Sequence, residues 1–127
     1  MIRGIGIDII ENARIHKILA RFGYLFAKKI LSSNELKEFY NAQNKSNFLA
    51  KRFASKEALS KSIGIGLYRQ GLSPKIIEIR KDHLGKPNII ITDELKPILK
   101  KYSISHLHLS VSDTSNLSTA IVVAEGN

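Results

Sequence analysis

The sequence contains no cysteine and no tryptophan, and acidic residues are few. Without cysteine there is no disulfide framework, no thiolate nucleophile and no zinc site built on sulfur, so any metal has to be held by oxygen or imidazole. The 20 lysines and arginines outnumber the 11 acidic residues, which gives a formal net charge of +9. This excess favours an anionic partner, and nucleic acid, an anionic membrane, a phosphorylated ligand and an acidic protein all fit it.

Long hydrophobic runs, internal repeats and low-complexity linkers are also absent. Asp8 and Glu11 interrupt the apolar N-terminal stretch, where a signal peptide or a transit peptide would be free of acidic residues. We therefore expect a soluble cytoplasmic protein that does not contact a membrane. Because 127 residues suit one ordinary domain and no linker divides them, we expect residues 1–127 to form a single domain.

The hydrophobic pattern near the N-terminus predicts a strand followed by a helix. β-Branched residues over 2–10 surround Gly4 and Gly6, which indicates a buried strand with two positions where another backbone comes close. Over 12–22 the apolar residues follow helical spacing, and Gly23 ends the segment.

The rest of the chain predicts a mixed α+β domain with about five strands and three or four helices. The expected elements are, in order, a helix through Tyr40 opened by a capping box of Ser32 and Glu35, a long helix over 46–63 stopped by Gly64, a strand over 75–80, a turn over 85–87, a strand over 88–91, a helix over 93–101, and strands over 106–112 and 120–124. The strands over 75–80 and 88–91 are predicted to pair as a hairpin.

Two carboxylates stand at positions where a solvated surface residue is not expected. Asp8 lies inside the apolar strand, and Glu57 lies on the side of the long helix that Ala50 and Ala54 predict to face inward. A strand carboxylate that faces a helix carboxylate is an oxygen-rich arrangement that Mg²⁺ accepts, with water and phosphate oxygens completing its octahedron. Together with Lys61, which follows Glu57 by one helical turn, the pair predicts a metal–phosphate site.

Both acids also have simpler interpretations. Glu57 and Lys61 are four residues apart, which fits an ordinary ion pair along a helix. Asp8 fits a cap for the helix that starts a few residues later, since Asp favours such positions. Sequence spacing does not distinguish these interpretations from the metal site.

Arg14, Lys17 and Arg21 share one side of the helix over 12–22. This stripe fits a solvated helix face or, given the net charge, a surface that docks an acidic helix. A small basic nucleic-acid-binding module without catalysis is the competing function. The chain has only five Phe and four Tyr, however, and no block of basic and aromatic residues typical of such a module.

Five segments, in chain order, resemble the holo-acyl-carrier-protein synthases, which are group-I 4'-phosphopantetheinyl transferases. They are Gly4-Ile5-Gly6-Ile7-Asp8-Ile9-Ile10-Glu11, Leu31-Ser32-x-x-Glu35, Phe48-Leu49-Ala50-Lys51-Arg52-Phe53-Ala54-Ser55-Lys56-Glu57-Ala58 with Lys61 and Gly64, Gly85-Lys86-Pro87, and His108-Leu109-Ser110-Val111-Ser112-Asp113. The likeness covers essentially the whole chain. Its first and third segments are highly specific in combination.

The resemblance implies a small α+β domain in which a mainly antiparallel sheet packs against the long helix, the fold of the 4'-phosphopantetheinyl transferases. It implies an Mg²⁺-dependent enzyme that moves the 4'-phosphopantetheine arm of coenzyme A to a serine of apo acyl carrier protein. Adenosine 3',5'-bisphosphate is left behind, and the product supports fatty acid biosynthesis. A homotrimer with active sites at subunit interfaces is also implied, without binding of nucleic acid.

Site residues follow from the resemblance by position. It implies that Asp8 and Glu57 bind Mg²⁺, that Glu57 and Lys61 are catalytic, that Arg52, Lys61, Gly64, Lys86 and Pro87 contact coenzyme A, and that Arg14, Lys17 and Arg21 dock the carrier protein. One position departs from the family, because some members have His where this chain has Asp113. An aspartate repels phosphate, so a phosphate-binding role of that His is not carried over.

Overall fold

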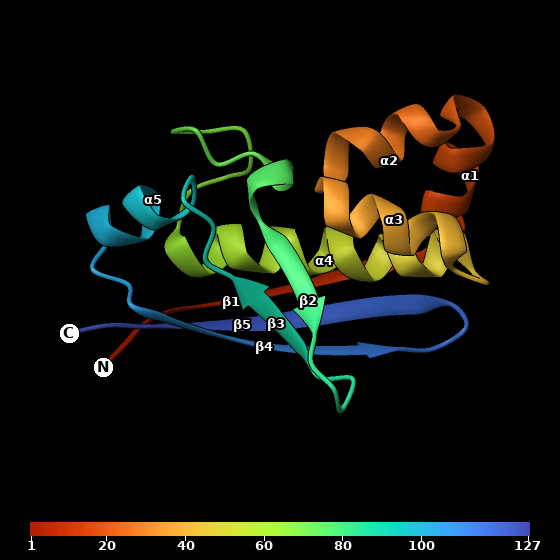
Figure 1. The fold of residues 1–127 in the computed structure, drawn as a ribbon. Helices are drawn as coiled ribbons and strands as arrows, with labels where there is room; N and C mark the ends of the chain where they lie inside the picture. Colours follow the sequence, from red (N-terminus) through yellow and green to blue (C-terminus); the bar gives the residue numbers. More distant parts are fainter.

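A long helix that lies across one face of a three-stranded antiparallel sheet forms the centre of the structure (Figure 1). The structure, a computed structural model, describes residues 1–127. The helix is α4 (Lys45–Ile63), and the strands follow the order β1 (Ile2–Glu11), β5 (Leu117–Glu125) and β4 (His106–Asp113). The expected α+β fold, with antiparallel strands against the long helix, is confirmed.

The remaining elements cover α4 from its other sides (Figure 1). Three helices lie near its N-terminal half, namely α1 (Asn12–Phe22), α2 (Tyr24–Ile30) and α3 (Ser33–Asn41). The expected hairpin is a separate two-stranded sheet of β2 (Glu78–Lys81) and β3 (Pro87–Ile90), and α5 (Lys96–Lys101) lies near the C-terminal end of α4. None of the five α-helices has the length and apolar character that a membrane span needs.

Two apolar clusters hold these layers together, because burying apolar side chains is the main favourable term in folding. The larger cluster joins α4 to the sheet and includes the buried residues Ala54, Ala58, Leu59, Leu109, Ala120 and Val122. The smaller cluster joins α4 to the three N-terminal helices and includes Ile15, Ala27, Ile30, Phe39 and Leu49. Both clusters use α4, so this helix sets the position of every layer.

β1 lies directly against the backbone of α4 at two glycines. A Cβ atom on Gly6 would lie 1.9 Å from the carbonyl oxygen of Ala58, and one on Gly4 would lie 1.9 Å from that of Ser62. No side chain fits these gaps, so both predicted close approaches are confirmed. Since Asp8 follows Gly6 by two residues, it points to the same face of the strand and therefore toward α4.

The opposite face of β1 is open. Ile5, Ile7 and Ile9 are 59%, 62% and 63% exposed, and Ile121, which pairs with Ile7 on β5, is 38% exposed. The expectation of a buried strand is therefore wrong for this half of β1. Only the face that carries the glycines packs on α4, and nothing within the chain covers the isoleucines.

Three other elements differ from the sequence prediction. The strand expected over 75–80 starts only at Glu78, because Pro74 opens a short 3₁₀ helix over Pro74–Ile76. The helix expected over 93–101 starts at Lys96, since Thr92 Oγ1 accepts a hydrogen bond from Leu95 N and holds the preceding residues in a turn. The seven-residue helix α2 was not predicted, because it is too short for a clear helical period.

The close approach at Gly6 predicts that adding a methyl group at this position lowers the stability of the protein. We expect Gly6→Ala to lower the free energy of unfolding by about 3 kcal/mol, because β1 has to move away from α4 to relieve the contact. Urea denaturation measures this change. Gly66→Ala is the matched control: its Cβ would meet only the Arg69 side chain, at 3.7 Å, so we expect a change below about 0.5 kcal/mol. Equal stability of both variants would contradict the prediction.

Candidate active site

Asp8 and Lys61 form an ion pair where β1 passes over α4. The Lys61 ammonium donates to Asp8 Oδ1 at 3.1 Å and to the carbonyl oxygen of Ile7 at 3.0 Å. The Lys61 side chain is 52% exposed and that of Asp8 is 16% exposed, so a ligand in solvent can reach the ammonium. Both simpler interpretations are wrong. The helix cap position is Glu11, and Lys61 pairs with Asp8 instead of Glu57.

Glu57 lies one turn before Lys61 on α4 and is half-buried. Burial raises the pKa of its carboxyl group, and the negative charge of Asp8 raises it further. Lys61 acts in the opposite direction without cancelling these effects. The structure therefore places the carboxylates of Asp8 and Glu57 within electrostatic reach of each other, with Lys61 as the cation beside them.

This donor set fits a divalent cation. Carboxylate oxygens are the ligands that Mg²⁺ prefers, and a cation beside Asp8 and Glu57 would offset the repulsion that raises the Glu57 pKa. His, Asp and Glu side chains form no metal-binding cluster of three or more anywhere in the structure. Water and phosphate oxygens would therefore complete the coordination shell, as is usual for Mg²⁺ beside phosphate substrates.

A second group of the expected residues lies around a cavity between α4, the β2–β3 hairpin and β4. The cavity has a volume of about 190 Å³, and Arg52, Gly85 and Pro87 line it. Lys86 lies on the exposed turn between Gly85 and Pro87 and does not line the cavity.

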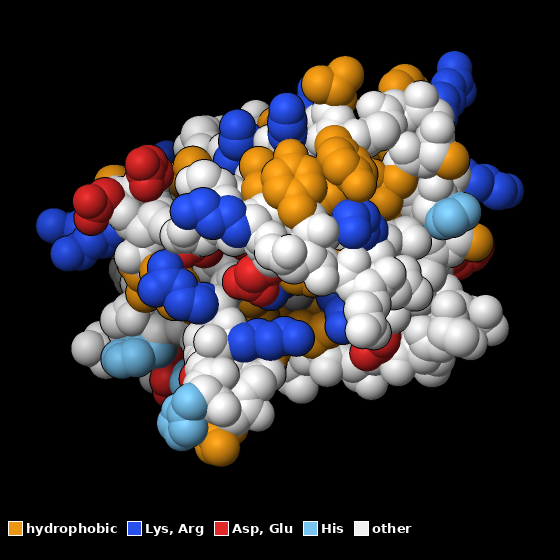
Figure 2. Space-filling model, turned by 45° about the vertical axis from the view of Figure 1, so that its right-hand side comes forward, with side chains coloured by type: hydrophobic (Ala, Val, Ile, Leu, Met, Phe, Trp, Pro, Cys, Tyr) orange, Lys and Arg blue, Asp and Glu red, His pale blue; other side chains and the backbone are white.

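Two lysines that the sequence analysis did not assign also line this cavity, Lys51 next to Arg52 and Lys81 at the end of β2. Asp113 lines it from the end of β4 and accepts a hydrogen bond from Asn47 Nδ2 at 3.1 Å. The Arg52 guanidinium is already paired with two carboxylates, so Lys51 and Lys81, against the single Asp113, supply the positive charge that suits an anionic ligand. Over the whole face drawn in Figure 2, basic side chains outnumber acidic ones.

The two groups lie on different sides of α4. At about 100° per residue, Arg52 and Glu57 are about 140° apart around the helix. In the sheet, β5 separates β1, which carries Asp8, from β4, which carries Asp113. Gly64, the left-handed C-cap of α4, follows Lys61 and so belongs to the carboxylate side. One chain therefore does not bring the expected metal ligands together with Arg52.

The third expected group, Arg14, Lys17 and Arg21, is exposed on α1. The guanidinium of Arg21 lies 5.1 Å from the centre of the Phe22 ring, which is itself 53% exposed. The stripe thus combines three cations with an accessible aromatic side chain, a mixture that suits a protein partner with acidic and apolar residues.

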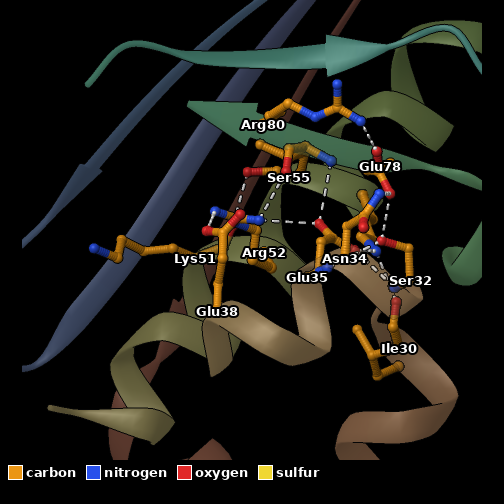
Figure 3. Close-up of polar contacts among 12 residues, drawn as sticks. Ile30, Ser32, Asn34, Glu35, Glu38, Lys51, Arg52, Ser55, Glu78 and Arg80 are labelled. Carbon is orange, nitrogen blue, oxygen red and sulfur yellow. Dashed lines mark hydrogen bonds and ion pairs between the residues drawn. The ribbon is translucent and has the colours of Figure 1, made fainter. Parts of the chain in front are cut away.

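The sequence analysis missed a buried charge network centred on Glu35 (Figure 3). Glu35 and Lys56 are both fully buried, and Lys56 Nζ lies 2.6 Å from Glu35 Oε1. Lys56 also donates to the carbonyl oxygens of Ile30 and Pro74, at 2.7 and 2.9 Å. Burial lowers the pKa of Lys56, and the charge of Glu35 opposes that effect. Arg52, only 4% exposed, donates to Glu35 Oε2 at 3.2 Å.

The spacing along α4 contained a signal for this network. Leu49, Arg52, Lys56 and Leu59 follow a helical repeat, so two leucines flank two cations on one face. A buried cation needs a buried carboxylate, and the capping-box residue Glu35 was available. The expected inward side of α4 was therefore incomplete: Ala50 and Ala54 are buried as expected, but Arg52 and Lys56 in the middle of the helix are buried too. Lys61, near the C-terminal end, is exposed.

Comparisons with known proteins identify the family of the chain. The family model "4'-phosphopantetheinyl transferase superfamily" matches residues 4–122. The holo-[acyl-carrier-protein] synthase of Wigglesworthia glossinidia brevipalpis is 43% identical over an alignment of 129 positions, which covers 98% of this chain and 92% of the relative. The crystal structure of the Neisseria meningitidis holo-[acyl-carrier-protein] synthase matches with a TM-score of 0.93 and 44% identity, over 98% of this chain and 99% of that chain.

A second solved structure comes from Helicobacter pylori and is a holo-[acyl-carrier-protein] synthase in complex with coenzyme A. It matches with a TM-score of 0.83 and 34% identity, over 95% of this chain and 99% of that chain. Family model, curated relatives and solved structures thus agree over nearly the full length. The chain belongs to the 4'-phosphopantetheinyl transferase superfamily, a family of enzymes.

Proposed function

We propose that this chain transfers the 4'-phosphopantetheine arm of coenzyme A to a serine of apo acyl carrier protein, in an Mg²⁺-dependent reaction that supports fatty acid biosynthesis. The observation that carries the proposal is the cluster of Asp8, Glu57 and Lys61 at the contact between β1 and α4. The names of the relatives support it, as does the coenzyme A complex of the Helicobacter pylori protein.

In the proposed reaction the serine oxygen of the carrier protein bonds to the β-phosphorus of coenzyme A. The bond from that phosphorus to the bridging oxygen breaks, and adenosine 3',5'-bisphosphate leaves with the electron pair. The departing phosphate gains negative charge, so cations placed beside it lower the barrier. The exposed ammonium of Lys61 supplies one such charge. The serine proton passes to a base, and the carboxylate of Glu57 is a group of this chain that can take it.

Asp8 and Glu57 are the proposed ligands of the Mg²⁺ ion. When bound, Mg²⁺ neutralises phosphate charge and makes the phosphorus more electrophilic. Its binding requires both carboxylates to be ionised, and the raised pKa of Glu57 means that this acid holds a proton at a higher pH than an isolated glutamate does. As the pH is lowered, the affinity for Mg²⁺ is therefore expected to begin falling at a higher pH than it would for a pair of ordinary carboxylates.

Coenzyme A is proposed to extend from this cluster on one chain into the basic cavity of a neighbouring chain. Arg52 and Pro87 line the cavity, and Lys86 lies on the exposed turn next to Pro87. Gly64 ends α4, three residues after Lys61. Phosphate groups pair well with guanidinium and ammonium groups, which supports placing the anionic part of the ligand there.

The proposed enzyme is a homotrimer with active sites at subunit interfaces. Two features support this assembly. Ile5, Ile7 and Ile9 form an apolar row that a single chain leaves exposed. The carboxylate cluster and the basic cavity lie on different sides of α4, so a site made from two chains can combine them.

Arg14, Lys17 and Arg21 are the proposed docking surface for the carrier protein. Their cations are exposed on one helix, where they can meet an acidic helix of a partner. A nucleic-acid-binding module without catalysis is not favoured, because the relatives are synthases. Paired carboxylates would also repel a phosphate backbone.

The transfer itself is tested by intact-protein mass spectrometry of apo acyl carrier protein incubated with this chain, coenzyme A and Mg²⁺. We expect the carrier to gain the mass of one phosphopantetheine group, and to gain nothing when EDTA is present. No gain with folded enzyme and competent carrier would overturn the proposed function. A full gain in EDTA would overturn the metal requirement alone.

In the same assay, we expect Asp8→Asn and Glu57→Gln each to lower kcat/KM by about a hundredfold, because each removes a metal ligand. Glu57→Gln should not lower the melting temperature, since it removes a half-buried charge that Asp8 repels. Asp8→Asn should change it little, because the ion pair that it loses with Lys61 is partly exposed. Asp93→Asn and Glu94→Gln are exposed matched controls and should keep full activity. Wild-type rates for Asp8→Asn or Glu57→Gln at limiting Mg²⁺ would contradict the assignment.

For the docking surface, we expect Arg14→Glu combined with Arg21→Glu to raise the KM for carrier protein about tenfold and to leave the KM for coenzyme A unchanged. Steady-state kinetics with each substrate varied in turn measures both values. Lys96→Glu combined with Lys100→Glu makes the same charge change on α5 and should not alter either KM. If the KM for carrier protein is unchanged in the α1 variant, then Arg14, Lys17 and Arg21 form only a solvated helix face.

Ile9→Glu tests the trimer. We expect light scattering to give three times the chain mass of 14.2 kDa for the wild type and the monomer mass for Ile9→Glu, since a buried carboxylate without a partner is costly. Transfer activity should be lost together with the trimer. Ile91→Glu is the control, because Ile91 is 41% exposed and follows β3, outside this face. A monomeric wild type that is active would contradict the proposal.

A further inference from the structure

We propose that Glu35 is a positioning residue for the coenzyme A cavity. Its buried carboxylate holds the Arg52 guanidinium and the β2–β3 hairpin in the arrangement in which both line the cavity. This inference rests on the proposed function, because it takes the cavity as the place where coenzyme A binds.

Glu35 is held on all sides. Its Oε1 accepts hydrogen bonds from the backbone N–H of Ser32 at 2.9 Å and from Lys56 Nζ at 2.6 Å. Its Oε2 accepts from Arg52 Nη1 at 3.2 Å and from the backbone N–H of Ile79 at 3.1 Å. Four donors from α2–α3, α4 and β2 use the acceptor positions of the carboxylate, so it has no freedom to rotate.

Arg52 depends on this carboxylate for its orientation. Its Nη1 atom also donates to the carbonyl oxygen of Ile79 at 2.8 Å, and its Nη2 atom donates to Glu38 Oε2 at 3.0 Å. The guanidinium carbon lies 4.6 Å from the centre of the Phe48 ring. Of the two acidic partners, Glu38 is 43% exposed and Glu35 is fully buried. Because exposed ion pairs constrain little, Glu35 is the partner that fixes the guanidinium.

The hairpin is tied to the same carboxylate. Both backbone groups of Ile79 take part, the N–H with Glu35 and the carbonyl oxygen with Arg52. Ile79 lies on β2, lines the cavity, and pairs with Ile89 on the strand that begins at Pro87. Figure 3 shows Glu35 and Glu38 reaching Arg52 beneath the hairpin strands. The network therefore sets how far Pro87 and its turn lie from α4.

Replacing Glu35 with glutamine breaks this geometry without changing the size of the side chain. The amide oxygen can accept from one pair of donors only, and the amide NH₂ group then faces the other pair. We expect Glu35→Gln to raise the KM for coenzyme A about tenfold, while kcat per folded enzyme and the KM for carrier protein stay within about twofold. A purely structural role would lower the amount of folded enzyme and leave both KM values unchanged.

A double-mutant cycle separates the effect of Glu35 that passes through Arg52 from the smaller effect that passes through its contact with the hairpin at Ile79. In an Arg52→Met background, Glu35→Gln should raise the KM for coenzyme A by less than about twofold further. Glu38→Gln is the matched control on the same guanidinium and should leave the KM unchanged. Lys56→Met removes the ion pair with Glu35 without touching Arg52, so it should lower the melting temperature and leave the KM for coenzyme A alone.

If Glu35→Gln does not fold, the measurement is made on Glu35→Gln combined with Lys56→Met, which removes the buried ammonium left without a counter-charge. An unchanged KM for coenzyme A in a folded Glu35 variant would overturn the proposal, and so would an equal increase in the Arg52→Met background. These outcomes are distinct from failure of the proposed function, in which the wild-type enzyme itself transfers no phosphopantetheine.

Discussion

Glu35 and Lys56 place opposite charges, both fully buried, where α2, α3, α4 and β2 meet. A buried pair of this kind adds little stability over apolar residues of the same volume, but the loss of one partner leaves an uncompensated charge and costs about 3–5 kcal/mol. The surrounding elements are therefore held in the one arrangement that gives every donor an acceptor. No buried side-chain nitrogen or oxygen lacks a hydrogen-bond partner. The position of the hairpin relative to α4 follows from this constraint.

A second constraint acts on the other side of α4, where two glycines without side chains let β1 lie close to the helix. At Gly4 and Gly6 the backbone of β1 lies against that of α4, closer than any Cβ atom allows. This proximity places Asp8 beside Lys61 and within the electrostatic reach of Glu57. Without it, the strand would stand off the helix by the length of a side chain, and the two carboxylates would be solvated separately. The helix α4 is thus the common reference for both candidate binding groups.

The sequence predicted those features that depend on local pattern. The capping box of Ser32 and Glu35, the ends of α1 and α4 at Gly23 and Gly64, and the close approach at Gly6 all follow from residue type and spacing. It failed where tertiary contacts decide. Whether Lys56 is buried depends on a carboxylate 21 residues away, and the exposure of Ile7 depends on what covers the sheet. The pairing of Lys61 with Asp8 likewise crosses 53 residues, so the local rule of i to i+4 pairing favoured the wrong partner.

These constraints explain why the chain, taken alone, carries two incomplete halves of the proposed site. The carboxylates and Lys61 lie on one side of α4, and the cavity that Arg52 lines lies on another side of it. The helix α4 and the strand β5 separate the two groups. Bending the fold to join them would break either the Gly6 contact or the Glu35 network. Rotational symmetry offers another solution, because a ring of copies lets one side of each chain face the other side of its neighbour. The exposed isoleucines of β1 supply the apolar surface that such a ring needs. In the proposed trimer, packing within each chain therefore fixes the two halves of the site, and contacts between chains bring the carboxylates of one chain next to the Arg52 cavity of its neighbour.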